Sequence, residues 1–159
     1  MKKTIMIVLG GGGHTQQLLP LVDKLERKYS LEFVVRKDGR PGKKKLEGKI
    51  FRISNPRPMD DAGVIKTILR LFPYTLESIK ILSKSKAKTI ISCGPAISIP
   101  ISLIGKILFR KKIIFIESWS RVKSKSFSGK LIGPLADKIF VQWEENKNYK
   151  NAIYAGRLG

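Results

Sequence analysis

Residues 4–14, TIMIVLGGGGH, place an apolar run directly before four glycines and a histidine. The run predicts a buried strand, and apolar residues at helical spacing after His14 predict a helix. Between a strand and a helix, residues without a Cβ let backbone N–H groups approach an oxyanion, and the helix N-terminus adds attraction. We therefore expect Gly11, Gly12 and Gly13 to bind a phosphorylated ligand. The apolar residues of the helix are Leu18, Leu21, Val22 and Leu25.

Two common nucleotide-binding motifs do not fit this turn. Thr15 replaces the last glycine of the dinucleotide fingerprint, and the second apolar run ends at Arg36 and Lys37 without the acidic residue that binds a ribose. No Gly-Lys-Ser/Thr sequence follows, which excludes a nucleoside-triphosphatase loop. Because proline is tolerated in the first turn of a helix, Pro20 predicts that the glycine loop extends through Thr15 or Gln16. An alternative remains open, in which the glycines only make the turn tight.

Composition and charge limit the class of protein. The chain has 159 residues, of which 42% are apolar, and this predicts a single domain over residues 1–159. A net charge of +20 predicts an anionic partner, either an anionic membrane surface or nucleic acid. The basic residues are spread along the chain and do not choose between these partners. One histidine and one cysteine, Cys93, make no metal-ligand set, so we expect neither a metal nor a cofactor.

Apolar runs and helical patterns alternate along the whole chain. This alternation predicts an α/β fold, a Rossmann-like doubly wound parallel sheet of about six strands in the order 3-2-1-4-5-6. Ligands bind such a sheet at the carboxyl ends of its strands, and the glycine turn, Gly94-Pro95 and Glu117 all fall at that edge. The expected strands are residues 4–9, 31–35, 49–53, 89–92, 112–116 and 138–141, and the later helices are residues 62–83, 96–109 and 128–136.

The helical region over residues 62–83 is expected to be kinked or divided at Pro73. Its first part is apolar on more than one side and also carries Lys66 and Arg70. Two interpretations remain open: a well-buried helix, or a helix whose outer apolar side lies on a membrane. No segment has the ~20 nearly uninterrupted apolar residues that cross a bilayer, so we expect a soluble or peripheral protein. The candidate membrane contacts are Ile65, Ile68, Leu69 and Phe72.

A set of short motifs spread over the chain points to a known family. The motifs are Gly11-Gly12-Gly13-His14 with Pro20, Gly94-Pro95 with Pro100, Glu117-Ser118 with Arg121, Val141-Gln142-Trp143 and Tyr154-x-Gly156-Arg157-Leu158. With them the chain resembles the acceptor-binding, N-terminal half of two-domain inverting GT-B glycosyltransferases. It is more similar still to the membrane-recruiting subunit of the split UDP-N-acetylglucosamine transferase of dolichol-linked oligosaccharide synthesis, and to the bacterial and archaeal polysaccharide-biosynthesis relatives of that subunit.

The resemblance implies a lipid-linked substrate and a partner. The chain would bind a lipid-diphosphate-linked sugar at the cytoplasmic face of the membrane and recruit a separate donor-binding catalytic subunit, without which it is inactive. The eukaryotic subunit has an N-terminal membrane helix that this sequence lacks, so attachment would use the basic surface and the apolar helix. The acceptor diphosphate would contact Gly11, Gly12, Gly13, Gly94 and Arg121. The partner would contact Trp143, Tyr154, Arg157 and Leu158.

An inverting transfer needs a base near the attacking hydroxyl and stabilisation of the departing diphosphate. His14 and Glu117 are the candidate catalytic residues, and the sequence does not assign the base between them. Alternatively, His14 closes the turn, and Glu117 pairs with Arg121 or caps the next helix. A rival function is a basic Rossmann-like module that binds nucleic acid without catalysis. It accounts for the charge but leaves the glycine turn, Gly94-Pro95 and Glu117 unexplained.

Overall fold

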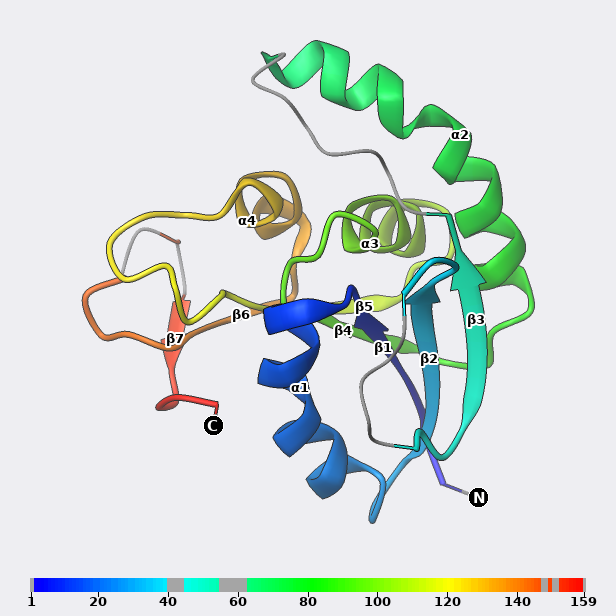
Figure 1. Cartoon of the computed structure of the whole chain (residues 1–159), viewed down its shortest axis with the longest axis horizontal. Helices are drawn as coiled ribbons and strands as arrows, with labels where there is room; N and C mark the ends of the chain where they lie inside the picture. Colours follow the sequence, from blue (N-terminus) through cyan, green and yellow to red (C-terminus); the bar gives the residue numbers. More distant parts are fainter. Residues whose placement is uncertain (1, 40–44, 55–62, 147–148, 150–151, 159) are drawn as a thin grey trace.

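In the computed structural model, the described residues form one sheet of seven parallel strands in the order β3-β2-β1-β4-β5-β6-β7 (Figure 1). The structure describes residues 2–39, 45–54, 63–146, 149 and 152–158, with the backbone alone over 63–72. The strands are β1 (Thr4–Leu9), β2 (Ser30–Arg36), β3 (Lys49–Ile53), β4 (Thr89–Ser92), β5 (Lys112–Ile116), β6 (Lys138–Val141) and β7 (Ala152–Tyr154). The helices are α1 (Gly12–Leu25), α2 (Gly63–Ser83), α3 (Ser98–Ile107), α4 (Phe127–Ile132) and the 3-10 helix η1 (Gly133–Leu135).

The doubly wound strand order is confirmed over β1 to β6. The chain runs outward from β1 to β3, crosses back to β4 and continues to the other edge, so the strand order reverses between β1 and β4. β7 is an addition, because the sequence pattern treats the C-terminal residues as a tail. It pairs in parallel with β6, through Ile139 with Ala152 and Val141 with Tyr154. Its three residues are too few to produce a periodic signal.

α1 begins at Gly12, so the expectation of a loop through Thr15 or Gln16 is wrong. The N-cap residue Gly11 has φ of 100°, and Gly12 has φ of 58°. Glycine adopts such angles at little cost, which lets the chain pass from β1 into the helix within a tight turn. Pro20 lies inside α1 at an exposed position, where the helix tolerates the missing backbone donor.

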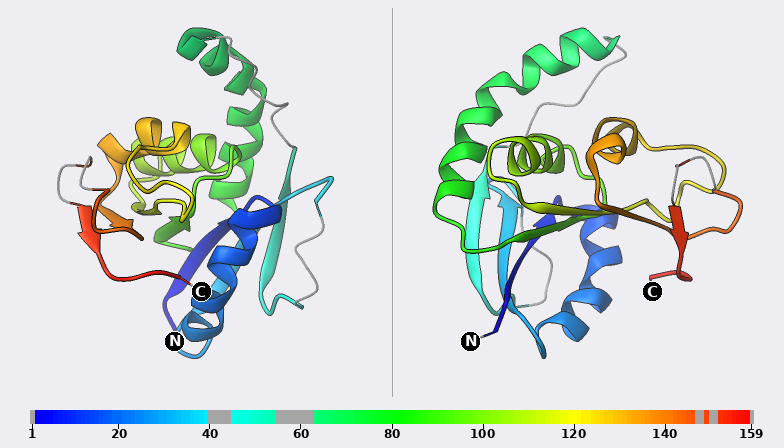
Figure 2. Two further views of the ribbon diagram at one scale, coloured as in Figure 1. Left: turned by 60° about the vertical axis from the view of Figure 1, so that its left-hand side comes forward. Right: turned by 180° about the vertical axis from the view of Figure 1, so that it is seen from behind.

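Of the two outcomes expected at Pro73, a kinked or a divided helix, only division is wrong: α2 runs through the proline as one bent helix and arcs past the β3 edge of the sheet (Figures 1 and 2). A proline inside a helix removes one backbone hydrogen bond and is a common cause of such bending. The last expected helix, over residues 128–136, is two short elements, because α4 ends before Gly133-Pro134 and η1 follows.

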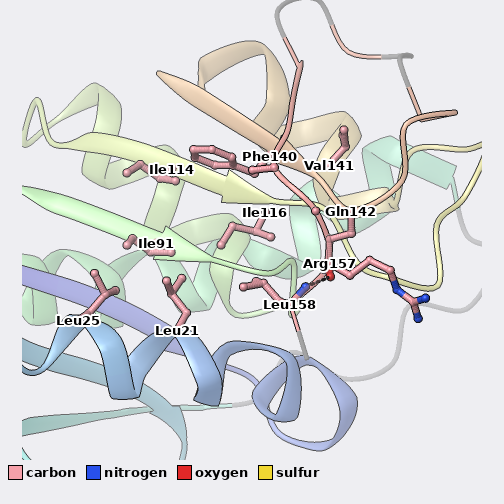
Figure 3. Close-up of a pocket in the computed structure, with 12 residues that line it drawn as sticks. Leu21, Leu25, Ile91, Ile114, Ile116, Phe140, Val141, Gln142, Arg157 and Leu158 are labelled. Carbon is pink, nitrogen blue, oxygen red and sulfur yellow. Dashed lines mark hydrogen bonds between the residues drawn. The ribbon is translucent and has the colours of Figure 1, made fainter.

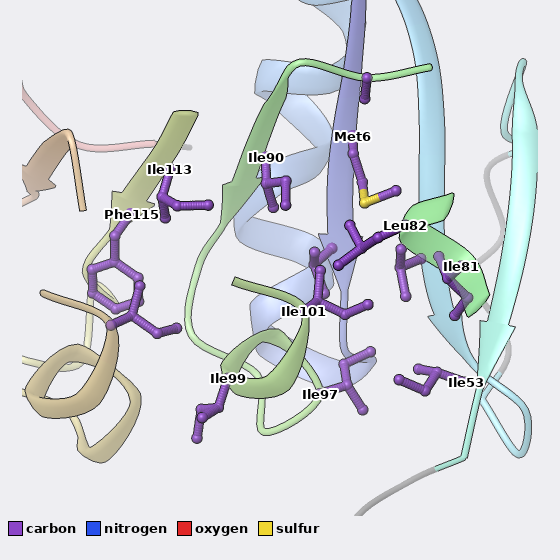
Figure 4. Close-up of a cluster of buried hydrophobic side chains, with 14 of the residues drawn as sticks. Met6, Ile53, Ile81, Leu82, Ile90, Ile97, Ile99, Ile101, Ile113 and Phe115 are labelled. Atoms are coloured by element: carbon purple, nitrogen blue, oxygen red, sulfur yellow. The ribbon is translucent and has the colours of Figure 1, made fainter. Parts of the chain in front are cut away.

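Helices cover both faces of the sheet (Figures 1 and 2). α2, α3 and α4 pack on one face, where Met6, Ile90 and Phe115 lie in one buried cluster with Leu82 and Ile101 (Figure 4). α1 packs on the other face through a second buried cluster. Strands covered on both faces carry apolar runs rather than alternating patterns, which is why the sequence located them to within one residue.

Candidate functional site

The four glycine positions after β1 have different structural surroundings. A Cβ on Gly10 would lie 2.0 Å from the Cβ of Pro95, so Gly10 allows the turn after β1 to pack against the turn after β4. Gly11 and Gly12 have the positive φ angles that begin α1. Gly13 is under neither constraint, and a Cβ on it would meet no described atom within 4 Å. Gly13 therefore borders open space at the N-terminus of α1, where an anion is attracted.

A basic side chain reaches this turn from the end of β2. The Nη1 atom of Arg36 lies 3.8 Å from the position of a Cβ on Gly11. The Arg36 guanidinium donates to both carboxylate oxygens of Asp38, at 2.9 and 2.8 Å, and these hydrogen bonds raise the pKa of Arg36. The sequence pattern placed Arg36 at the start of a basic segment beside the ligand edge but did not single it out as a site residue. Its place at the carboxyl end of a strand next to β1 was the signal that could have identified it as a site residue.

His14 is the third residue of α1 and is half-buried. Burial lowers the pKa of His14 below its ordinary value of 6.5, and the backbone of Cys93 and the charge of Glu117 offset this only in part. The Nδ1 atom is buried and has no hydrogen-bond partner among the described residues. The imidazole is therefore neutral near pH 7, which is the state that a general base requires.

Glu117 follows β5 and is 1% exposed. Its Oε1 accepts from the backbone N of Ser118 at 2.8 Å, and its Oε2 accepts from the backbone N of Ser126 at 3.0 Å and from the hydroxyl of Tyr149. Ser126 is the N-cap residue of α4. Burial and the hydrogen bond to Glu117 raise the pKa of Tyr149, so the phenol stays protonated as a donor. The Glu117 carboxylate thus holds the β5–α4 loop (residues 118–126) against the start of α4.

We expect Tyr149→Phe to destabilise the fold by ~1–3 kcal/mol, because the buried Glu117 carboxylate loses its hydroxyl donor. Tyr154→Phe is the matched control: Tyr154 is 50% exposed on β7, and its variant should lie within ~0.5 kcal/mol of the wild type. Urea unfolding of the two variants measures both free energies. Equal unfolding midpoints for both variants would mean that the hydrogen bond from Tyr149 to the buried Glu117 carboxylate does not stabilise the fold.

The other residues expected at the diphosphate lie in different surroundings. Gly94 is buried with φ of 83°, and its carbonyl accepts from the hydroxyl of Ser128 at 2.6 Å. A Cβ on Gly94 would lie 3.5 Å from the ring of Phe115, so this glycine joins the end of β4 to α4. Arg121 is exposed on the β5–α4 loop, and its carbonyl accepts from the side chain of Asn146 at 2.8 Å.

The C-terminal tail (residues 155–158) returns to the glycine turn. The guanidinium of Arg157 lies 4.6 Å from the ring centroid of Trp143, and the Nε1 of Trp143 donates to the carbonyl of Trp119. Three of the four expected partner contacts therefore gather beside the turn, and the fourth, Tyr154, lies on β7. A pocket of about 270 Å³ lies between the glycine turn and the tail. It is lined by Gly13, Gln16, Gln17, Trp119, Arg157 and Leu158.

A second, apolar pocket of about 260 Å³ lies between α1, the sheet and the tail (Figure 3). Leu21 and Leu25 border it from α1, and Leu158 borders it from the tail. The strands contribute Ile91, Ile114, Ile116 and Phe140. This part of the α1 face therefore presents apolar side chains around an unfilled space.

The candidate membrane residues Ile65, Ile68, Leu69 and Phe72 lie in the first half of α2. Their side chains fall outside the described part of the chain, so the structure does not test this expectation. None of the described helices is both long enough and apolar enough to cross a bilayer.

The fold defines the class of protein. The chain superposes on Acinetobacter baumannii MurG with a TM-score of 0.75 over 96% of its length, at 15% identity. It superposes on UDP-N-acetylglucosamine 2-epimerase from Rickettsia bellii with a TM-score of 0.70 over 99% of its length, at 12% identity. It spans 44% and 45% of these two proteins, less than half of each. The chain therefore has the Rossmann-like architecture of one half of a GT-B protein.

Sequence comparison gives the family. The model for oligosaccharide biosynthesis proteins of the Alg14-like family matches residues 5–158, and the chain belongs to this family. UDP-N-acetylglucosamine transferase subunit alg14 of Schizosaccharomyces pombe is 31% identical over 98% of this chain and 83% of the relative. The human subunit ALG14 is 29% identical over 98% of this chain and 82% of the relative. The resemblance drawn from the motifs is confirmed, and the family is one of glycosyltransferase subunits.

Proposed function

We propose that this chain is the acceptor-binding, membrane-associated subunit of a two-chain inverting glycosyltransferase. It acts on a lipid-diphosphate-linked sugar and recruits a donor-binding subunit that holds UDP-N-acetylglucosamine. The observation that carries the proposal is the open space at Gly13, at the N-terminus of α1, with Trp119 and the tail lining the pocket beside it. Membership in a family of transferase subunits, and a fold that matches half of a GT-B protein, support the division between two chains.

The glycine turn suits a diphosphate. The first N–H groups of a helix have no intrahelical acceptor, so those of Gly12 and Gly13 are available to phosphate oxygens. The guanidinium of Arg36, paired with Asp38, lies beside the turn at the end of β2, and Arg121 adds positive charge on the exposed β5–α4 loop. Gly94 acts indirectly in this account, since it supports the turn that packs on Gly10 through Pro95.

The transfer itself needs a base on this side of the complex. The acceptor hydroxyl attacks the anomeric carbon of the donor, a new carbon–oxygen bond forms, and the bond to the departing UDP breaks. The hydroxyl proton passes to the neutral imidazole of His14, which is accessible because the residue is only half-buried. Glu117 is a positioning residue, because its oxygens already accept hydrogen bonds from the β5–α4 loop and Tyr149.

Membrane binding can be tested with this chain alone, without the donor-binding subunit. A net charge of +20 should retain the protein on phosphatidylglycerol vesicles at low salt and release it at high salt. Ile68→Asp with Phe72→Asp should abolish flotation, because charged side chains cannot enter the apolar interface. Leu76→Asp is the matched control, since Leu76 is 66% exposed on the second half of α2 and should leave flotation unchanged.

The same preparation separates the two functional classes. Vesicle flotation that survives in a folded double variant would remove the first half of α2 as the membrane contact. A gel shift with ~micromolar or tighter, salt-sensitive binding to nucleic acid, in the absence of vesicle binding, would favour the nucleic-acid module instead.

A further inference from the structure

Two buried glutamines lie between the glycine turn and the C-terminal tail. Gln17 on α1 is 7% exposed, and Gln142, directly after β6, is 2% exposed. Burial of an amide costs free energy unless its donors and acceptors are paired. The pairing of these two amides therefore shows which parts of the chain they hold together.

The side chain of Gln17 joins segments that follow three strands, β4, β5 and β6. Its Oε1 accepts from the Sγ of Cys93 after β4, from the backbone N of Trp119 after β5 and from the Nε2 of Gln142, each at 3.1 Å. Its own Nε2 donates to the hydroxyl of Ser118 at 3.4 Å. Because a backbone N–H can only donate, the contact with Trp119 fixes the orientation of the Gln17 amide.

The side chain of Gln142 continues the path to the tail. Its Nε2 also donates to the carbonyl of Glu117 at 2.9 Å, and its Oε1 accepts from the backbone N of Leu158 at 2.9 Å (Figure 3). Both partners are backbone groups, so the orientation of this amide is fixed as well. One path of hydrogen bonds therefore runs from Leu158 through both glutamines to Trp119, and linked bonds of this kind strengthen one another.

The path connects two surfaces with different expected ligands. Trp119 is 49% exposed and lines the pocket that it shares with Gly13, where the acceptor is proposed to bind. Arg157 and Leu158 in the tail also line that pocket and belong to the proposed partner surface. The path of hydrogen bonds therefore joins the tail to Trp119 beside the glycine turn.

We infer that Gln17 and Gln142 are positioning residues that couple docking of the partner subunit on the C-terminal tail to acceptor binding at the glycine turn. This inference rests on the proposed function. Each ligand favours the arrangement in which the tail, the glutamines and the β5–α4 loop are locked together. The coupling is therefore positive and, by thermodynamic linkage, equal in both directions.

The test measures this coupling in the complex of the full chain with its donor-binding subunit. Calorimetric titration gives the Kd of the partner with and without saturating polyprenyl-diphosphate-linked N-acetylglucosamine. In the wild type, the acceptor should lower that Kd about tenfold. Gln17→Met keeps the size of the side chain but not its hydrogen bonds, and should reduce the effect to less than about twofold. Gln17→Glu keeps an oxygen for the same three donors and should retain most of the effect of the acceptor on that Kd.

A spectroscopic signal separates coupling from stability. The chain has two tryptophans, Trp119 and Trp143, and both lie in this cluster, so a 5-fluorotryptophan sample gives two ¹⁹F signals. Partner binding should shift the Trp119 signal in the wild type and in Gln17→Glu, but not in Gln17→Met. Ile101→Val, a buried change among the α3 residues, is the control for lost stability and should keep the wild-type coupling.

The outcomes distinguish this inference from the proposed function. Wild-type coupling in Gln17→Met, loss of coupling in Ile101→Val, or an active wild-type complex without coupling would each overturn the inference. A wild-type complex that neither binds the acceptor nor transfers sugar would overturn the proposed function.

Discussion

Changing His14 to alanine is expected to lower kcat of the reconstituted complex by ~10²–10⁴-fold, which is the usual contribution of a general base. The fold should survive, because His14 is half-buried, its Nδ1 has no hydrogen-bond partner among the described residues, and the change removes only the interaction of the imidazole with the backbone of Cys93. Initial rates at saturating donor and acceptor measure the effect. A loss smaller than about tenfold would leave His14 as a turn residue and move the base elsewhere.

The pH profile adds a second check on the same residue. Burial places the pKa of His14 below 6.5, so the imidazole is unprotonated and active at pH 7. As pH falls through this lowered pKa, protonation removes the base, and kcat/KM should decrease along an acid limb below pH 6.5. The residual activity of His14→Ala should lack this limb. An unchanged limb in the variant would assign it to another group.

Gly13→Ala should separate activity from stability. A Cβ on Gly13 meets no described atom within 4 Å, and alanine is favoured over glycine in a helix, so the variant should be more stable by ~0.4–1 kcal/mol. In the complex, the same methyl group occupies the space where a phosphate approaches the helix N-terminus. Displacement of the acceptor by about 1 Å can cost ~10²-fold, and we expect a loss of this size in kcat/KM.

Gly105→Ala is the matched control for Gly13→Ala. Gly105 lies in α3, and its Cβ would be 2.5 Å from the Cδ1 of Ile90 in the core. We therefore expect a loss of ~1–3 kcal/mol in stability with kcat/KM retained. Thermal melting and acceptor titration of both variants give the comparison. Wild-type kcat/KM in Gly13→Ala would mean that the phosphate does not approach this glycine.

The sequence predicted the sheet well because the central strands β1, β2 and β4 are buried and carry nearly continuous apolar runs. It missed β7, since three half-exposed residues carry no pattern and pair only because β6 lies beside them. It also misplaced the start of α1. The positive φ of Gly12 is a property of the folded turn. Pro20 predicted a later start of the helix, but at its exposed position α1 tolerates the proline beyond the first turn.

The sequence predicted those site residues whose position depends only on neighbouring elements of the chain. His14 and Gly13 follow from a strand, a turn and a helix that are adjacent in the sequence. The role of Glu117 depends on Tyr149, which is 32 residues away, and the role of Gln17 depends on Gln142, which is 125 residues away. Such pairings depend on strand order and on the path of the tail, so no local pattern could reveal them.

This chain is proposed to provide the acceptor side of a transferase whose donor side is a separate subunit. The most direct measurement supplies UDP-N-acetylglucosamine and a lipid-diphosphate-linked acceptor to three samples: this chain alone, the donor-binding subunit alone, and their mixture. Positioning of both reactants can contribute up to ~7–11 kcal/mol to the rate, and in the proposed division each chain positions only one of them. We predict turnover in the mixture only. Sugar transfer by this chain alone, at a rate that its partner does not increase, would contradict the account.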